Sequence, residues 1–99
     1  MYFVYLLTNR WKTVLYMGMT DSIPGRLSDH RNRRFNGFTK NYNCTQLVYF
    51  ETFETAAAAA KREKQIKGWT RAKKNALIAT INPEWNDLST QGILRFAQD

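Results

Sequence analysis

Two short apolar segments, rich in aromatic and β-branched residues, open the chain and predict a β-hairpin. They cover residues 2–8 (YFVYLLT) and 13–20 (TVLYMGMT). The polar stretch 9–12 between them has the length of a hairpin connection. Because side chains alternate between the two faces of a strand, we expect Tyr5 and Tyr16 together on one face of the antiparallel pair.

A helix and a loop are predicted after the hairpin. Asp21 or Ser22 can cap the helix, and Pro24 is tolerated in its first turn. The helix is expected to run to about Arg33. The segment 35–44 (FNGFTKNYNC) is rich in Gly and Asn, which predicts a mobile loop.

The second half of the chain predicts one more strand and two helices. Residues 46–53 (QLVYFETF) are apolar enough for the interior of a sheet. Five consecutive alanines begin a helix over 55–67, which Gly68 can end as its C′ residue. Thr70 can cap a last helix, 71–81, whose apolar residues form a stripe.

The predicted order β-β-α-β-α-α indicates an α+β domain with a small three-stranded antiparallel sheet flanked by helices. We expect the helices to cover the face of the sheet that Tyr5 and Tyr16 do not occupy. Trp85 and Leu88 are expected to fold back onto the core.

The composition narrows the class of protein. A chain of 99 residues with 43% hydrophobic residues fits a single packed domain. We expect this domain over residues 1–88, with residues 89–99 as a flexible tail. Cys44 stands alone, which excludes an intramolecular disulfide and a Cys-rich zinc site and favours a reducing, cytoplasmic location. No apolar run reaches the length of a membrane span.

Positive charge dominates and is concentrated in two segments. Fifteen Lys and Arg against eight Asp and Glu give a net charge of +7, which predicts an anionic partner, nucleic acid before membrane headgroups. The cations gather in 26–40 and 61–74, among aromatic rings that can stack on bases. A basic run is often only a solvated helix face. However, 61–74 contains a single acid, Glu63.

Common catalytic motifs are absent from the chain. It has no P-loop, no Gly-rich dinucleotide fingerprint and no GxSxG motif. Cys44 could pair with His30 as a nucleophile, but an inert, buried thiol is the expectation. No small-molecule cofactor is indicated.

One ordered set of residues does indicate chemistry. Val4-Tyr5-Leu6 is followed ten residues later by Tyr16-Met17-Gly18, then by Arg26 and His30 one helical turn apart, and at a distance by Glu63. In this set the sequence resembles the GIY-YIG nuclease superfamily, and most of all its small stand-alone bacterial members.

Three further blocks carry the same resemblance. They are the loop GFTK at 37–40, the block REKQIKGW at 62–69 and the block NPEW at 82–85, and a helical Asn75 fits as well. The likeness extends from Tyr2 to about Leu88. It implies a metal-dependent nuclease with a metal-ligating Glu63 and catalytic roles for the residues that follow: Tyr5, Tyr16, Arg26, His30 and Asn75.

The chemistry of phosphodiester hydrolysis gives these residues consistent roles. Glu63 could hold one Mg²⁺ or Mn²⁺ per active site, since a single carboxylate plus waters suits magnesium. Arg26 can direct two donors at phosphate oxygens. A tyrosine, Tyr5 or Tyr16, would orient the water and accept its proton if nearby cations favour the phenolate, and His30 is the other candidate base.

The resemblance and the charge together predict a DNA endonuclease that is structure-selective or of low sequence specificity. DNA is favoured over RNA, in repair or recombination, with the protein a monomer or weak dimer. Backbone contacts are expected from seven cations: Arg31, Arg33, Arg34, Lys40, Lys64, Lys67 and Arg71.

Two alternatives stay open. The first is a nucleic-acid-binding module of the same fold without efficient catalysis. It is motivated by Val4 and Leu6 in the first triplet and by Met19 where some family members have a lysine. The second is a basic domain that binds an acidic protein.

Overall fold

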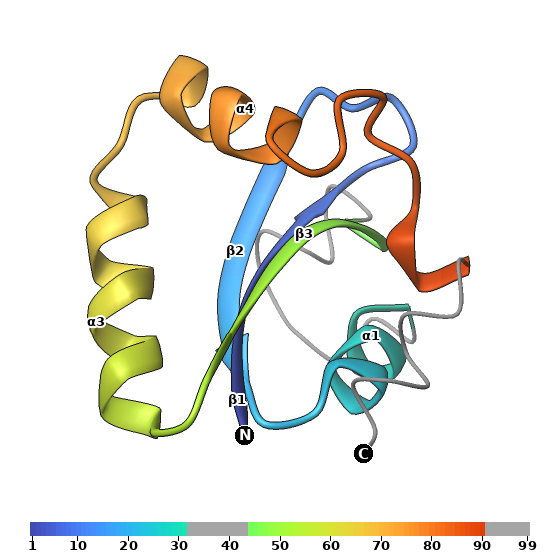
Figure 1. The fold of residues 1–99 in the computed structure, drawn as a ribbon. Coiled ribbons are helices and arrows are strands. Elements are labelled where there is room, and N and C mark those ends of the chain that lie inside the picture. Colours follow the sequence, from blue (N-terminus) through green and yellow to red (C-terminus); the bar gives the residue numbers. More distant parts are fainter. Residues whose placement is uncertain (32–43, 91–99) are drawn as a thin grey trace.

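The computed structural model describes residues 1–31 and 44–90 (Figure 1). Within these ranges the elements follow the predicted order β-β-α-β-α-α, so the predicted α+β class is confirmed. The elements are β1 (Tyr2–Thr8), β2 (Leu15–Thr20), α1 (Ile23–Arg31), β3 (Gln46–Phe53), α3 (Ala56–Lys67), α4 (Arg71–Ala79) and the 3₁₀ turn η1 (Leu88–Thr90).

The three strands form one antiparallel sheet in the order β2-β1-β3, with β1 at its centre. In the β1–β2 pair, Tyr5 lies opposite Gly18 and Leu7 lies opposite Tyr16. Residues two apart on a strand share a face, so Tyr5 and Tyr16 lie on the same face, as predicted.

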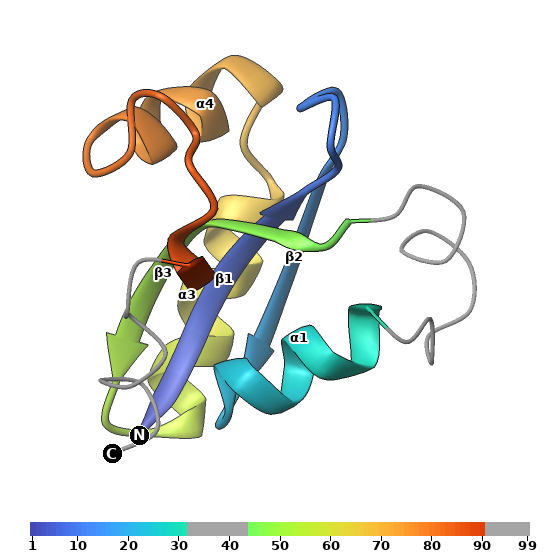
Figure 2. The same cartoon turned by 90° about the vertical axis from the view of Figure 1, so that its right-hand side faces the viewer.

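Helices cover both faces of this sheet. Figure 1 shows α3 and α4 on one side of the strands and α1 on the other, and Figure 2 gives the perpendicular view. The expectation that helices cover only the face away from the two tyrosines was wrong, because Tyr5 packs in one cluster with Ile23 and Leu27 of α1. The physical reason is that β1 is apolar on both faces, and each apolar face must be buried.

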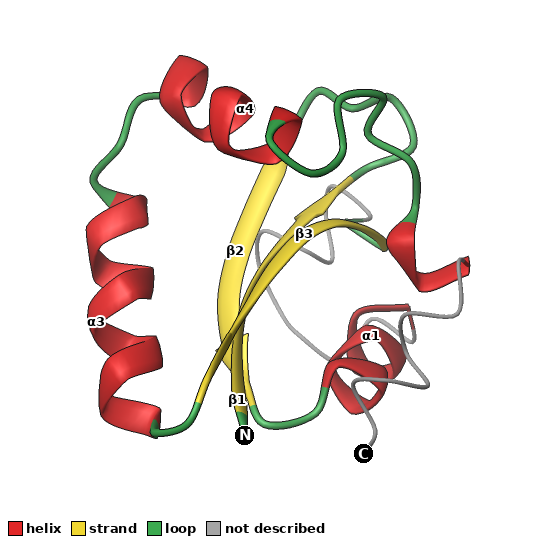
Figure 3. Cartoon of the chain, viewed as in Figure 1, coloured by secondary structure: helices red, strands yellow, loops and turns green. Residues whose placement is uncertain are grey.

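The sheet therefore separates two hydrophobic clusters. Figure 3 shows the helices on the two sides of the strands. The cluster under α3 and α4 contains Val4, Leu6, Met17, Val48, Tyr49, Ala59, Ile66 and Ile78. The cluster under α1 contains Phe3, Tyr5, Leu7, Ile23, Leu27, Cys44 and Leu47.

Short polar side chains begin the helices where the sequence indicates. The Ser22 hydroxyl accepts a hydrogen bond from the Gly25 amide at 3.2 Å. The Thr55 and Thr70 hydroxyls accept from amides in the first turns of α3 and α4. Gly68 ends α3 as predicted, but its φ of −79° is right-handed, so a glycine is not required there. The last helix ends at Ala79, two residues before the predicted end at 81.

The segment after α4 folds back onto β3. The Asn82 carboxamide donates to the carbonyl oxygens of Val48 (3.0 Å) and Asn86 (2.9 Å), and its oxygen accepts from the Asn86 amide. The Asp87 carboxylate accepts from the Leu47 amide at 3.2 Å.

Side chains of this returning segment reach both clusters. Trp85 packs against the cluster under α3 and α4, and Leu88 packs against the cluster under α1, as predicted. Most of the loop predicted at 35–44, the helix end expected near Arg33 and residues 91–99 of the predicted tail lie outside the described residues. In the described part of the chain, no helix is both long and apolar enough to cross a bilayer.

Candidate active site

Two tyrosines from neighbouring strands form the centre of the candidate site. Tyr5 projects from the central strand β1 and is only 4% exposed, whereas Tyr16 on the edge strand β2 is partly exposed. Their ring centroids are 6.5 Å apart with an interplanar angle of 42°, a tilted arrangement that is favourable for aromatic pairs. The site is thus a buried phenol next to an accessible one.

Gly18 makes room for the buried phenol. A Cβ built on this residue would lie 2.6 Å from the Tyr5 Cζ atom and still closer to the hydroxyl oxygen. No side chain fits at that separation, so the glycine of the second triplet is required by close approach. The sequence indicates this glycine only through the family resemblance.

Burial raises the pKa of Tyr5, and Tyr16 and the carboxylates of Glu63 and Asp29 raise it further, against the opposing effect of the Arg26 guanidinium. The expectation that nearby cations favour a phenolate is therefore not met at Tyr5. Its hydroxyl stays protonated at neutral pH and is suited to donate a hydrogen bond.

The Arg26 side chain lies between two hollows on the α1 side of the sheet. It borders a closely packed apolar crevice, without room for a water molecule, together with Tyr5, Leu7, Ile23, Leu27 and Leu47. It also lines an open hollow of about 180 Å³ with Thr20, Asp21, Ser22, Gly25 and Asp29. His30 follows one turn later on α1, but its side chain lies outside the described part.

Glu63 lies on α3 and is paired with the next turn of its helix. The Lys67 ammonium is 2.8 Å from its Oε1 atom, and the side chains of Glu63 and Lys67 are 20% and 56% exposed. The charge of Glu63 contributes to the raised pKa of Tyr5. In residues 1–31 and 44–90, no three His, Cys, Asp or Glu side chains gather into a metal-binding group. A lone carboxylate oxygen still fits Mg²⁺, which keeps most of its waters.

A basic pocket of about 280 Å³ adjoins this carboxylate on the α3–α4 side of β2. Its lining residues are Leu6, Leu15, Tyr16, Met17, Lys67 and Lys74. Sequence reasoning missed Lys74, because only the packing of α4 brings this lysine next to Lys67. The dense positive charge of 61–74 was the only available signal.

Asn75 lies on α4 and is held by a neighbouring arginine. The Arg71 Nε–H donates to the Asn75 Oδ1 atom at 2.9 Å, and the two Nη groups donate to the carbonyl oxygens of Thr13 (3.0 Å) and Lys12 (3.4 Å). The Arg71 guanidinium also lies 5.8 Å from the centre of the Trp85 ring. Arg71 therefore joins α4 to the hairpin, a role that nothing in the sequence pattern indicated.

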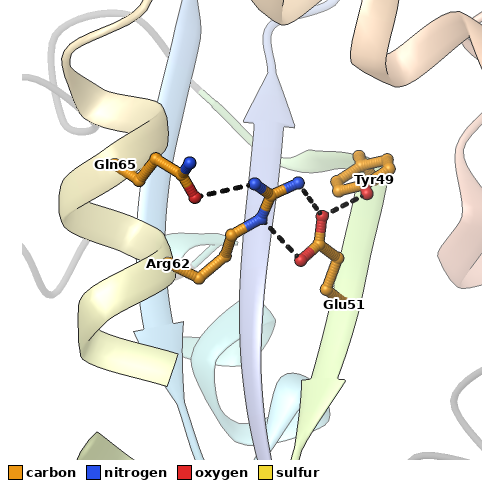
Figure 4. Close-up of polar contacts among 4 residues, drawn as sticks. All are labelled: Tyr49, Glu51, Arg62 and Gln65. Atoms are coloured by element: carbon orange, nitrogen blue, oxygen red, sulfur yellow. Dashed lines mark hydrogen bonds and ion pairs between the residues drawn. The ribbon is translucent and has the colours of Figure 1, made fainter. Parts of the chain in front are cut away.

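A second polar group, also missed from the sequence, fixes α3 to β3 (Figure 4). The Arg62 guanidinium donates to both carboxylate oxygens of Glu51, at 2.9 and 3.0 Å, and to the Gln65 side chain at 2.9 Å. The Tyr49 hydroxyl donates to the same carboxylate. Because Arg62 precedes Glu63, this group sets the rotation of α3 and hence the direction of the Glu63 side chain.

Burial alone would raise the pKa of Glu51, but the hydrogen bonds from Arg62 and Tyr49 outweigh it, so this pKa lies below its usual value. Burial and the bond to Glu51 raise the pKa of Tyr49. The group is thus an ionised carboxylate held by a guanidinium and a neutral phenol.

The remaining predicted residues are distributed as follows. Lys64 is exposed on α3, whereas the side chains of Arg31, Arg33, Arg34 and Lys40 lie outside the described part. Cys44 is fully buried, as predicted, and burial raises the pKa of its thiol to about 11, which disfavours the reactive thiolate.

Comparison with known proteins gives a family match over most of the chain. A model of the GIY-YIG catalytic domain matches residues 1–76. A UPF0213 protein of Syntrophus aciditrophicus is 39% identical over 83 residues, which cover 83% of this chain and 93% of that protein. A UPF0213 protein of Natronomonas pharaonis is 35% identical over 78 residues, covering 79% of this chain and 91% of that protein.

One solved structure has a similar fold. It is the solution NMR structure of a UPF0213 protein from Bacillus halodurans, with a TM-score of 0.56 at 22% identity. The alignment covers 88% of this chain and 92% of that one. None of these names specifies an activity.

Proposed function

This chain belongs to the GIY-YIG family, and on that premise we propose that it is a divalent-metal-dependent endonuclease that hydrolyses phosphodiester bonds in DNA. The observation that supports it best is the electrostatic coupling of Tyr5 to Tyr16, Arg26 and Glu63, which come from β2, α1 and α3. A cation, a carboxylate and two phenols from separate elements thus act on one another electrostatically, which supports a common site.

Each of these side chains has a role in the proposed reaction. A metal ion bound through Glu63 would supply Lewis-acid stabilisation of the phosphoryl oxygens and the leaving alkoxide. Arg26 would direct two donors at the phosphate. Tyr5, with its raised pKa, would donate a hydrogen bond to a phosphate oxygen.

The proton of the attacking water requires a separate acceptor in this proposal. Tyr16 is the more exposed phenol, and imidazole is the commonest proton acceptor near neutral pH, so either Tyr16 or His30 would orient the water and take its proton. Asn75 would act as a positioning residue on α4.

DNA recognition in this proposal relies on backbone and shape. A domain of this size leaves little room for a separate reader of base sequence, so flaps, nicks and single-stranded junctions are the expected substrates. Arg31, Arg33, Arg34 and Lys40 would add contacts from one segment, and Lys64, Lys67 and Arg71 from the other. We further propose action in the cytoplasm, in repair or recombination, as a monomer or weak dimer.

A nucleic-acid-binding module without efficient cleavage is the second candidate. It is favoured by the ion pair of Lys67 with Glu63, which places a cation on the carboxylate that a metal would need. The departures from the family triplets at Val4 and Leu6 also favour a binding module without efficient cleavage.

Plasmid nicking separates the two candidates. Wild-type protein with Mg²⁺ or Mn²⁺ is compared with Glu63→Ala and Tyr5→Phe, and with Glu54→Ala as a control at an exposed carboxylate. The proposal expects wild type and the control to nick and the two site variants to lose at least a hundredfold in rate. Nicking that both site variants retain contradicts the assigned site. DNA binding without nicking in any metal supports the second candidate.

A further inference from the structure

The basic pocket beside Glu63 has the composition of an anion site. Two lysines from different helices, Lys67 at the end of α3 and Lys74 on α4, face a wall formed by the β2 residues Leu15, Tyr16 and Met17. The pocket is open to solvent on one side and holds about 280 Å³, enough for a phosphate group.

The charges of this pocket are unbalanced. Lys74 is half-buried, and no acidic partner for it occurs in the described part of the chain. Lys67 shares the carboxylate of Glu63, the only acid within 61–74. Lys67 is exposed and Lys74 is half-buried, and a single carboxylate does not balance two ammonium groups. The pocket therefore carries net positive charge, which favours a bound anion.

Tyr16 connects this pocket with the other half of the candidate site. Its ring lies 6.5 Å from that of Tyr5, whose pocket on the α1 side also contains Arg26, and it lines the lysine pocket on the α3–α4 side. Cationic groups thus lie on both sides of the β2 edge. A polyanionic strand that crosses this edge would meet a cation on each side.

We infer that Lys67 and Lys74 bind a phosphodiester group of the substrate strand that neighbours the group to be cleaved. This inference rests on the proposed function and adds a second phosphate position to it, with Lys74 as a new binding residue. A phosphodiester suits the pocket because its two non-bridging oxygens can each accept from one of the two ammonium groups, and because the proposed substrate strand carries such groups in series.

The shared lysine couples this position to the metal-binding carboxylate. As long as Lys67 is paired with Glu63, only part of its charge serves the pocket. If Glu63 held a metal ion, its carboxylate would no longer pair with Lys67, and the Lys67 ammonium would be available to the phosphate. Phosphate binding in the pocket should therefore strengthen in the presence of metal.

DNA binding in EDTA tests the inference without any cleavage. We compare Lys74→Gln with Lys61→Gln, which removes one exposed charge from α3 and does not line the pocket. For a nicked duplex at about 0.1 M salt, Lys74→Gln is expected to weaken binding about five- to tenfold and to lower the salt slope by about one, as for loss of a phosphate contact. Lys61→Gln is expected to weaken binding less than about twofold.

A second measurement uses inorganic phosphate and NMR. The amide resonances of Tyr16 and Met17 should shift saturably with phosphate, not with chloride at the same ionic strength, and should stop responding in Lys74→Gln. Equal losses of DNA affinity in Lys74→Gln and Lys61→Gln, or phosphate shifts that persist in Lys74→Gln, would overturn the inference. Failure of wild type to cleave would count against the proposed function alone, because both measurements read binding.

Discussion

Tyr5 and Gly18 lie directly opposite each other on β1 and β2, and the phenol of the first occupies the space that a side chain on the second would need. The two triplets of the family are therefore one packing unit, in which the glycine of the second admits the tyrosine of the first. This relationship fixes the end of the Tyr5 ring over Gly18.

Gly18→Ala should displace the Tyr5 ring. A Cβ at 2.6 Å from Cζ must push the ring or the strand aside, and such overpacking costs about 1–3 kcal/mol of unfolding free energy. Urea denaturation measures this loss, and nicking by the variant should fall together with it. Gly68→Ala is the control, because its Cβ would lie at an ordinary 3.5 Å from the Gln65 carbonyl oxygen and φ is already right-handed. We expect it to be neutral or stabilising by about 0.5 kcal/mol, and equal costs for the two alanines would contradict the steric explanation.

Tyr5→Phe should flatten the loss of stability at alkaline pH. The folded pKa of Tyr5 is raised above its ordinary value of 10.0, mainly by burial, so folding favours the protonated phenol. The associated stability is fully present below about pH 10 and is lost as the pH rises above it. Urea denaturation from pH 8 to 11 should show a shallower decline in the variant. An identical decline of stability with pH in wild type and Tyr5→Phe would contradict a raised pKa of Tyr5 in the folded protein.

Glu51→Gln should weaken the fold at neutral pH and alter its acid sensitivity. The pKa of Glu51 lies below its ordinary value of 4.5 in the folded protein, because bonds from Arg62 and Tyr49 outweigh the effect of burial. Its stabilisation is therefore present above about pH 4.5 and is lost as the pH falls further. We expect the variant to lose about 1–2 kcal/mol of unfolding free energy at pH 7. Between pH 5 and 3 its unfolding free energy should decline less than that of wild type. Glu54→Gln replaces an exposed carboxylate and should leave unchanged both the stability at pH 7 and its decline between pH 5 and 3.

Lys67→Gln should increase the affinity for Mn²⁺. The ammonium 2.8 Å from Glu63 competes with a cation for the same carboxylate, and its removal favours the metal by about two- to fivefold at moderate ionic strength. Calorimetric titration measures the change, with Lys64→Gln as a control on the same helix. Glu63→Gln should abolish the binding. Unchanged affinity in Lys67→Gln would show that Glu63 is not the ligand.

Arg71→Lys should destabilise the protein although the charge is retained. The guanidinium donates to Asn75, Thr13 and Lys12 at once, and an ammonium on a flexible stem cannot reproduce these directions. We expect a loss of about 1–2 kcal/mol in thermal or urea unfolding. A stability equal to wild type, combined with weakened DNA binding, would instead assign Arg71 to the phosphate backbone.

Much of the sheet could be predicted because its determinants are local. Alternation of side chains along 2–8 and 13–20 placed Tyr5 and Tyr16 on one face, and the observed register agrees. The position of α1 could not be derived from the two tyrosines alone. Phe3 and Leu7 share their face and are fully buried, so that face required cover as well.

The site was harder to predict because its properties depend on distant packing. A tyrosine base requires nearby cations that lower its pKa, but burial has the larger effect on Tyr5 and raises its pKa. Lys74 and Arg71 acquire their partners only after the turn at 68–70 sets α4 against the hairpin. No spacing rule in a single sequence gives that angle.

The hydrogen bonds of Asn82 limit how far the chain can be truncated at its C-terminal end without loss of the fold. The Asn82 carboxamide donates a hydrogen bond to the carbonyl oxygen of Val48, and the Asp87 carboxylate accepts one from the Leu47 amide, so both side chains hold the returning segment on the outer strand β3. The family match ends at residue 76, before either of these side chains. A chain cut at that boundary would uncover backbone groups on β3 and remove Trp85 and Leu88 from the two clusters. The smallest unit able to fold alone is therefore expected to extend beyond the part that matches the family model, because its final turns hold the outer strand of the sheet in place.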